Sequence, residues 1–123
     1  MPGSNASMVI MIVDDEPDIC STFKLILEHR YPSREILTAK NGVDCLETLS
    51  RIKFLDPSVV ITDLQMPVMN GIELRKEIKK KYPGLKMILL TACSRIDAEG
   101  FDRVLLKPVN INDLFKCIEN IYC

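Results

Sequence analysis

Five short segments rich in apolar residues recur along the chain, at residues 9–13, 35–38, 58–62, 87–90 and 104–106. The second is the weakest, and Asp56-Pro57 marks a turn before the third. Continuous apolar runs of this length are typical of strands that are buried on both faces, as in a parallel sheet. We therefore expect these segments to be the strands of one sheet.

Between these segments, apolar residues recur at the three- and four-residue spacing of a helix. Pro17 suits the first turn of the first helix, and Asn41 opens the second. Asn70 with Glu73 forms a capping-box pattern at the start of the third, and Asn110 opens the last. The residues expected on the buried faces are Ile19, Phe23, Ile26, Leu27, Val43, Leu46, Leu49, Leu74, Ile78, Leu114, Ile118 and Ile121.

The interval between the fourth and fifth strands is too short for a full helix. Thr91 ends one strand and Asp102 approaches the next, so that only residues 92–101 lie between them. Once connecting residues are allowed for, about one or two helical turns remain. Ile96 and Ala98 are the only apolar contacts of those turns, which tertiary packing can hold only weakly. We expect this fourth helix to be short, and its segment to be mobile or irregular.

The alternation of strands and helices predicts an α/β fold, with a doubly wound parallel sheet covered by helices on both faces. A chain of 123 residues is long enough for one domain and too short for two. Residues 1–7 are small, polar and without periodicity, and they resemble a cloning scar. We therefore assign the domain to residues 8–123.

The composition limits the class of function. Sixteen basic and seventeen acidic residues give a net charge of −1, so no basic surface for nucleic acid is indicated. No apolar run is long enough to cross a membrane. The single histidine excludes a multi-histidine metal site, and five cysteines without a C-x-x-C pair argue against a disulfide framework or a zinc site. Reduced thiols of this kind suit a cytoplasmic protein.

A polar residue follows four of the apolar runs. Asp14 and Asp15 follow the first, Asp63 the third, Thr91 the fourth and Lys107 the fifth. Because the carboxyl ends of parallel strands share one edge of the sheet, we expect these side chains to converge there. Crowded carboxylates repel one another unless a cation lies among them, and hard oxygen ligands suit Mg²⁺. The ammonium and the hydroxyl suit a phosphoryl group, with one carboxylate as its nucleophile.

The motifs around these residues resemble the receiver domain of two-component response regulators. The matching segments are VIMIVDDEP at 9–17, DLQMP at 63–67 with Gly71, Thr91-Ala92 and Lys107-Pro108. The resemblance extends from Met8 to the C-terminus. It implies a flavodoxin-like, five-stranded sheet of order 2-1-3-4-5, with the first and third strands at the switch point. It also implies a cis peptide between Lys107 and Pro108.

The resemblance implies a role for each strand-end residue. Asp63 would be the phospho-acceptor, Lys107 would pair with the phosphoryl group, and Thr91 would move to bond it. The Mg²⁺ site would comprise Asp14, Asp15, Asp63 and the backbone carbonyl of Gln65, with Asp14 acting through a metal-bound water. The phosphoryl group would come from a sensor histidine kinase or a histidine phosphotransfer protein. The domain would be a signalling module that promotes its own phosphorylation and dephosphorylation, not an enzyme, without direct contact to nucleic acid or membrane.

Other interpretations make different demands on the sequence. A flavin-binding protein of this fold would need a loop rich in Ser, Thr and Gly where residues 14–17 stand, and a haloacid-dehalogenase-type phosphatase would need Asp-x-Asp, which residues 63–65 lack. The acids at 14–15 could simply cap a helix. A pseudo-receiver that only binds a partner also remains, because Val104 stands where the family usually has Tyr or Phe. With Val104 and a short fourth helix, we expect the output to leave by another face, such as the first helix.

Overall fold

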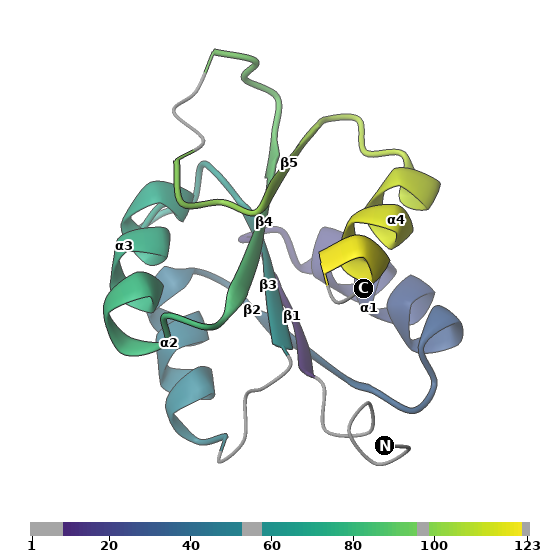
Figure 1. Cartoon of the computed structure of the whole chain (residues 1–123), viewed down its shortest axis with the longest axis horizontal. Coiled ribbons are helices and arrows are strands. Elements are labelled where there is room, and N and C mark those ends of the chain that lie inside the picture. Colours follow the sequence, from purple (N-terminus) through teal and green to yellow (C-terminus); the bar gives the residue numbers. More distant parts are fainter. Residues whose placement is uncertain (1–8, 53–57, 96–98, 122–123) are drawn as a thin grey trace.

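A five-stranded parallel sheet forms the centre of the computed structural model (Figure 1). The structure describes residues 9–52, 58–95 and 99–121. The strand order is β2-β1-β3-β4-β5, which confirms the predicted order. The strands are β1 (Val9–Val13), β2 (Glu35–Ala39), β3 (Ser58–Asp63), β4 (Lys86–Thr91) and β5 (Arg103–Leu106).

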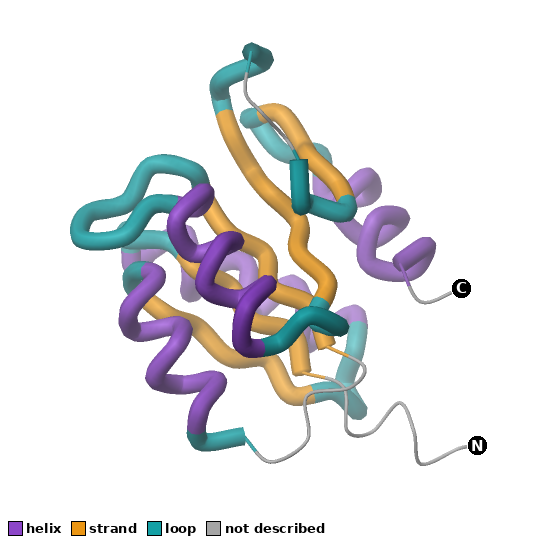
Figure 2. The backbone as a smooth tube through the Cα atoms, turned by 60° about the vertical axis from the view of Figure 1, so that its left-hand side comes forward, coloured by secondary structure: helices purple, strands orange, loops and turns teal. Residues whose placement is uncertain are grey.

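Helices cover both faces of the sheet, which confirms the doubly wound architecture (Figures 1 and 2). The helices are α1 (Pro17–Arg30), α2 (Gly42–Ser50), α3 (Gly71–Lys81) and α4 (Ile111–Ile121). One cluster of buried residues lies under α1 and α4, and a second lies under α2 and α3. Within the described residues, no helix has the length and apolar character needed to cross a membrane.

The inner strand β1 is buried along its whole length. Ile10 and Ile12 point into the cluster under α1 and α4, whereas Met11 and Val13 point into the other cluster. Burial of an apolar side chain of this size stabilises the fold by about 1.5–3 kcal/mol. Because β1 lies between β2 and β3, the chain that follows Val13 emerges in the middle of the carboxyl edge.

Helices α2 and α3 begin directly after the capping residues that the sequence predicted, Asn41 and Asn70. The Asn70 side chain accepts from the Glu73 amide while the Glu73 side chain accepts from the Asn70 amide, which is the complete capping box. The Asn41 side chain accepts from the amide of Asp44 at the start of α2. Each cap satisfies backbone donors that the helix itself leaves unpaired.

The predicted buried face of α2 is confirmed for Leu46 and Leu49 and is wrong for Val43. Val43 is 38% exposed, whereas Cys45 is fully buried and Leu49 is 1% exposed. The helix turns Gly42 towards the β3–α3 loop, where a Cβ would lie 2.7 Å from Met69 Cγ. That close approach selects the face carrying residues 42, 45 and 49. The prediction for Ile19 is also wrong, because Ile19 is 37% exposed and its neighbour Cys20 occupies the core.

The β4–β5 connection contains no helix in its described parts, residues 92–95 and 99–102, so these parts are irregular, as predicted. Figure 2 shows it as a loop beside the sheet. Its end is held at β4, where the Asp102 amide donates to Met87 O and Asp102 Oδ2 accepts from the Met87 amide, both at 2.8 Å. Segment 1–7, the Asp56-Pro57 turn, Ile96 and Ala98 lie outside the described residues.

The described cysteines are all free thiols. Cys20 and Cys45 are buried, Cys117 is half-buried and Cys93 is exposed. Cys123 lies outside the described residues. Burial raises the pKa of the Cys45 thiol to about 12, so it remains protonated at neutral pH.

Candidate functional site

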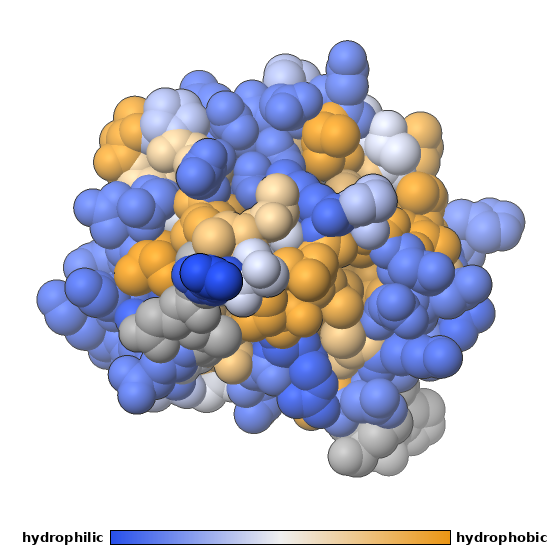
Figure 3. Space-filling model, turned by 90° about the horizontal axis from the view of Figure 1, so that it is seen from above, coloured by the Kyte–Doolittle hydropathy of each residue, from blue (hydrophilic) through white to orange (hydrophobic). Residues whose placement is uncertain are grey.

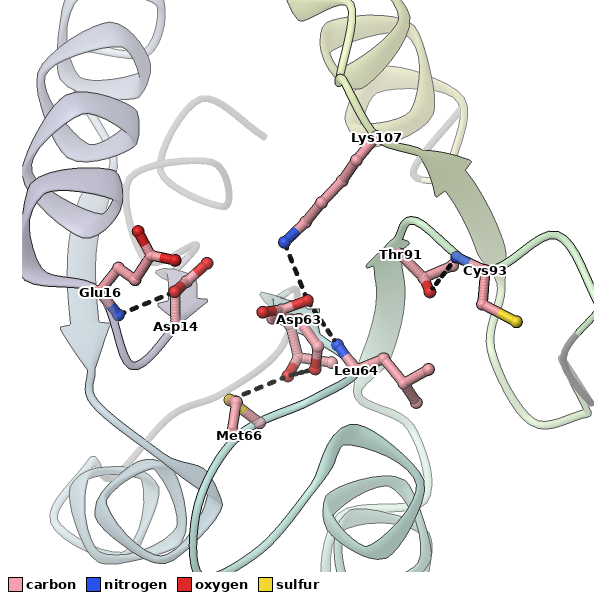
Figure 4. A network of polar contacts seen from close by, with 9 residues as sticks. Asp14, Glu16, Asp63, Leu64, Met66, Thr91, Cys93 and Lys107 are labelled. Atoms are coloured by element: carbon pink, nitrogen blue, oxygen red, sulfur yellow. Dashed lines mark hydrogen bonds and ion pairs between the residues drawn. The ribbon is translucent and has the colours of Figure 1, made fainter.

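The polar residues that follow the strands converge at one edge of the sheet, as the sequence predicted (Figure 4). A hollow of about 450 Å³ is lined there by Asp15, Asp63, Gln65, Thr91 and Lys107. Figure 3 views the molecule from this edge and shows hydrophobic surface among hydrophilic groups. The convergence follows from topology, because β1, β3, β4 and β5 all end at this edge.

The Asp63 carboxylate at the end of β3 is held by two donors. Lys107 Nζ lies 3.0 Å from Asp63 Oδ1, and the Leu64 amide donates to the same oxygen at 2.8 Å. The Asp63 side chain is 14% exposed and the Lys107 side chain 38% exposed. One carboxylate oxygen is therefore fixed by the protein, and the whole group can be reached from the hollow.

Asp14 directly follows β1 and is 5% exposed. Its Oδ1 accepts from the Glu16 amide at 2.9 Å, and its own amide donates to Ala39 O at 3.1 Å. Burial raises the pKa of the Asp14 carboxyl; the Glu16 hydrogen bond opposes this shift and the nearby Asp63 charge adds to it. Glu16 is the residue that precedes α1, and no side chain caps that helix. The predicted alternative of simple helix capping by the acid pair therefore does not describe these residues.

The three carboxylates form a set that fits a divalent cation. One oxygen from each of Asp14, Asp15 and Asp63 lies within 4.8 Å of the others. Lys107 supplies a single positive charge next to these acids. Oxygen ligands in an open hollow that leaves room for water are the environment that Mg²⁺ prefers. The donor set is thus suited to Mg²⁺, which would also favour the charged form of Asp14.

Thr91 at the end of β4 is 2% exposed and lines the same hollow. Its Oγ accepts from the Cys93 amide at 3.0 Å. The Lys107 amide donates to Thr91 O at 2.8 Å, which ties the end of β5 to the end of β4. The Lys107–Pro108 peptide is cis, as the sequence resemblance implied. Cys93 lines the hollow with Thr91.

The β3–α3 loop returns tightly to the site. The Gly71 amide donates to Leu64 O at 2.8 Å, and a Cβ at Gly71 would lie 2.6 Å from Asp63 O. Only glycine leaves room for this approach. Val68, in the same loop, has a φ of 72° and is 78% exposed. A β-branched residue in this left-handed region is strained.

Some contacts of the site were not predicted. The backbone amide of Glu16 orients the Asp14 carboxylate, and that of Leu64 orients the Asp63 carboxylate. The Cys20 thiol donates to Asp14 O at 3.3 Å. Glu16 was visible in the sequence beside Asp14 and Asp15, but backbone donation leaves no signal in residue type. Val104, in contrast, lies outside the hollow and is half-buried in β5.

A family model described as the response regulator receiver domain matches residues 10–119. The transcriptional regulatory protein GlrR of Escherichia coli is 35% identical over 117 residues, which cover 90% of this chain and 25% of GlrR. The DNA-binding transcriptional regulator NtrC of the same organism is 31% identical over 90% of this chain and 24% of NtrC. The chain thus spans about a quarter of the length of these relatives.

Solved structures of a receiver domain and of a response regulator also resemble this chain. A receiver domain protein from Clostridium thermocellum superimposes with a TM-score of 0.80 and 34% identity, covering 92% of each chain. The response regulator TrrA from Thermotoga maritima, in complex with Mg²⁺ and BeF, has a TM-score of 0.78 and 34% identity, covering 92% of this chain and 97% of TrrA.

Proposed function

Because the chain belongs to the response regulator receiver domain family, we propose that it accepts a phosphoryl group on Asp63 and changes conformation in response. The observation that carries this proposal is the position of the Asp63 carboxylate. It is accessible from the hollow, fixed by the Leu64 amide and Lys107, and close to two further acids. No other described carboxylate has this set of neighbours.

The transfer is a nucleophilic displacement at phosphorus. The free oxygen of Asp63 forms the new O–P bond, while the P–N bond of a phosphohistidine breaks and its electron pair returns to the imidazole ring. Asp63 Oδ1 stays oriented by the Leu64 amide during this step. The product is an aspartyl phosphate, and water later returns the carboxylate by hydrolysis.

Asp14, Asp15, Asp63 and the Gln65 backbone carbonyl would hold Mg²⁺, with Asp14 acting through a bound water. When bound, the ion neutralises charge on the transferring phosphoryl oxygens. Asp14 and Asp15 directly follow the buried strand β1, so the chain presents these oxygens at the carboxyl edge of the sheet.

Lys107 and Thr91 would recognise the phosphoryl group. Lys107 exchanges its present partner, Asp63 Oδ1, for a phosphoryl oxygen, and its ammonium offsets the added negative charge. The Thr91 hydroxyl donates to a second oxygen, and movement of the side chain towards that oxygen would alter the contact in which Thr91 Oγ accepts from the Cys93 amide. This exchange of hydrogen bonds would couple phosphorylation to the start of the β4–β5 connection.

The proposed partner is a sensor histidine kinase or a histidine phosphotransfer protein in the cytoplasm. The domain would be a signalling module whose only chemistry is its own phosphorylation and dephosphorylation. An output through α1 is also part of the proposal, because the β4–β5 connection supplies no described helix for a signalling surface.

Intact-mass measurement after incubation with acetyl phosphate and Mg²⁺ tests the function. The parent protein should gain one phosphoryl group, and the Asp63→Asn variant should gain none. Asp113→Asn, which changes an exposed acid in the first turn of α4, is the matched control and should react like the parent. Phosphorylation of the Asp63→Asn variant would show that another residue accepts the phosphoryl group. An unlabelled parent under both acetyl phosphate and kinase treatment would favour a module that only binds a partner.

A further inference from the structure

The outer side of α3 borders a groove that the proposed phosphorylation does not use. The groove has a volume of about 760 Å³. Met69, Arg75, Lys76 and Lys79 line it from the side of α3, and Glu99 and Gly100 line it from the β4–β5 connection. It exists because this connection, in its described parts, runs past α3 without forming a helix.

The wall formed by the connection is held firmly against α3. Gly100 has a φ of 91°, and a Cβ at this position would lie 2.5 Å from Arg75 Cδ. The Arg75 guanidinium lies over the Phe101 ring at 5.7 Å, and Phe101 packs against the core under α2 and α3. Asp102 then joins the connection to β4 through its two hydrogen bonds with Met87. The groove is therefore formed before any partner arrives.

The acidic residues that line the groove have partners within the protein, whereas two of its lysines have no ion-pair partner among the described residues. Glu73 is engaged in the capping box of α3, and Glu77 pairs with Lys80 at 3.6 Å. Glu99 also has a partner within the protein. Lys76 and Lys79 form no ion pair with any described residue, and both are exposed. Two cations without an ion pair to a described residue therefore lie on one side of a helix, three residues apart, in a groove that Met69 also lines.

We propose that this groove binds an acidic, amphipathic helical segment of a partner protein. Two carboxylates of the segment pair with Lys76 and Lys79, and an apolar residue covers Met69. A densely charged polyanion such as duplex DNA or an anionic membrane fits less well, because Glu73 and Glu77 lie in the same groove and repel it. The proposed segment brings only two carboxylates into the groove and therefore meets less repulsion from Glu73, Glu77 and Glu99 than a polyanion does.

The interaction should be weak and dependent on salt. Exposed ion pairs each contribute little to affinity, and added salt screens them. The apolar contact with Met69 and the preformed wall supply the remaining affinity. We expect binding to weaken several-fold when salt is raised from about 0.05 M to about 0.3 M.

A fluorescein-labelled synthetic helix of about 15 residues, with Glu on one face and Leu on the other, is the probe. Fluorescence anisotropy measures its affinity, and NMR of the ¹⁵N-labelled domain locates it. The amides of residues 69–80 and 99–102 should shift. The double variant Lys76→Glu/Lys79→Glu should bind about tenfold more weakly, since two attractions become repulsions. Lys116→Glu, an exposed lysine on α4 in the opposite layer, is the control and should bind as the parent does.

Several results would overturn the proposal. These are equal affinity of the double variant, resonance shifts confined to other surfaces, no binding of the acidic probe, or equal binding of a probe with Lys in place of Glu. Tighter, lysine-dependent binding of anionic vesicles or duplex DNA would also overturn it. The double variant should still be phosphorylated on Asp63, so failure here is separable from failure of the proposed function. Circular dichroism confirms that the variants fold.

Discussion

Lys107 Nζ lies 3.0 Å from Asp63 Oδ1, so a single ion pair joins the end of β5 to the end of β3 across the intervening strand β4. The Lys107 amide at the same time donates to Thr91 O on β4. Three strand ends are therefore linked through one residue. A phosphoryl group on Asp63 competes for the ammonium of that residue, and any movement of Lys107 is transmitted to β4 and β5.

Replacement of Lys107 by Ala should impair the response to phosphorylation more than it impairs Mg²⁺ binding. The ammonium offsets phosphoryl charge, whereas it repels the metal ion, so its loss leaves Mg²⁺ affinity within about threefold of the parent. NMR titrations with Mg²⁺ alone and with Mg²⁺ plus acetyl phosphate separate the two effects. Lys116→Ala is the control. Lost metal affinity with an intact phosphorylation response would contradict the assignment of Lys107.

Asp14→Asn should stabilise the protein in the absence of Mg²⁺ and remove the stabilisation that Mg²⁺ provides. Burial raises the pKa of Asp14, so the ionised carboxyl opposes folding once the pH exceeds its ordinary pKa, and this loss of stability is complete above the raised value. We expect the melting temperature to rise by a few degrees, which corresponds to about 1 kcal/mol. Thermal unfolding with and without Mg²⁺ measures both effects. Asp113→Asn should show neither, and a destabilised Asp14→Asn would refute the argument.

Tyr31 should ionise at unusually high pH. Burial, with the hydrogen bond to Glu119 at 3.0 Å, raises its pKa to about 12 from the ordinary 10.0. The unfolded chain releases this proton first, so the stability that Tyr31 contributes is complete below pH 10.0 and is lost as the pH rises towards about 12. Phenolate absorbance of the parent minus that of Tyr31→Phe isolates the transition. A difference titration centred near pH 10 would show that neither the burial of the phenol nor its contact with Glu119 raises the pKa of Tyr31.

Val68→Gly should leave the fold unchanged and stabilise it by about 1 kcal/mol. A left-handed backbone costs a residue with a Cβ about 1–2 kcal/mol, which exceeds the entropic cost of glycine at this position. Because Val68 is 78% exposed, little packing is lost. Denaturant unfolding measures the change. Val68→Ala keeps the Cβ and should gain much less, so equal gains for Ala and Gly would show that the backbone is not strained.

The sequence by itself determined the parallel strands and the composition of the site, whereas the strand order was implied by the resemblance to the receiver family. Buried parallel strands require continuous apolar runs, and the polar residues that interrupt those runs must then meet at one edge. Asp14, Asp63, Thr91 and Lys107 were identifiable for this reason, before any distance was known. The absence of a described helix between β4 and β5 followed similarly from chain length, because about ten residues cannot supply two connections and three turns.

The tertiary structure decided what depends on contacts between residues far apart in the chain. Periodicity allowed Val43 on the buried face of α2, but the approach of Gly42 to Met69 turned Cys45 inwards instead. The pairing of Lys107 with Asp63, and the wall that Gly100 forms against Arg75, were likewise invisible in either local sequence. The local pattern of apolar and polar residues indicates which residues are buried and which lie at the end of a strand. Only the packing of helices and loops determines which side chains come within a few ångströms of one another.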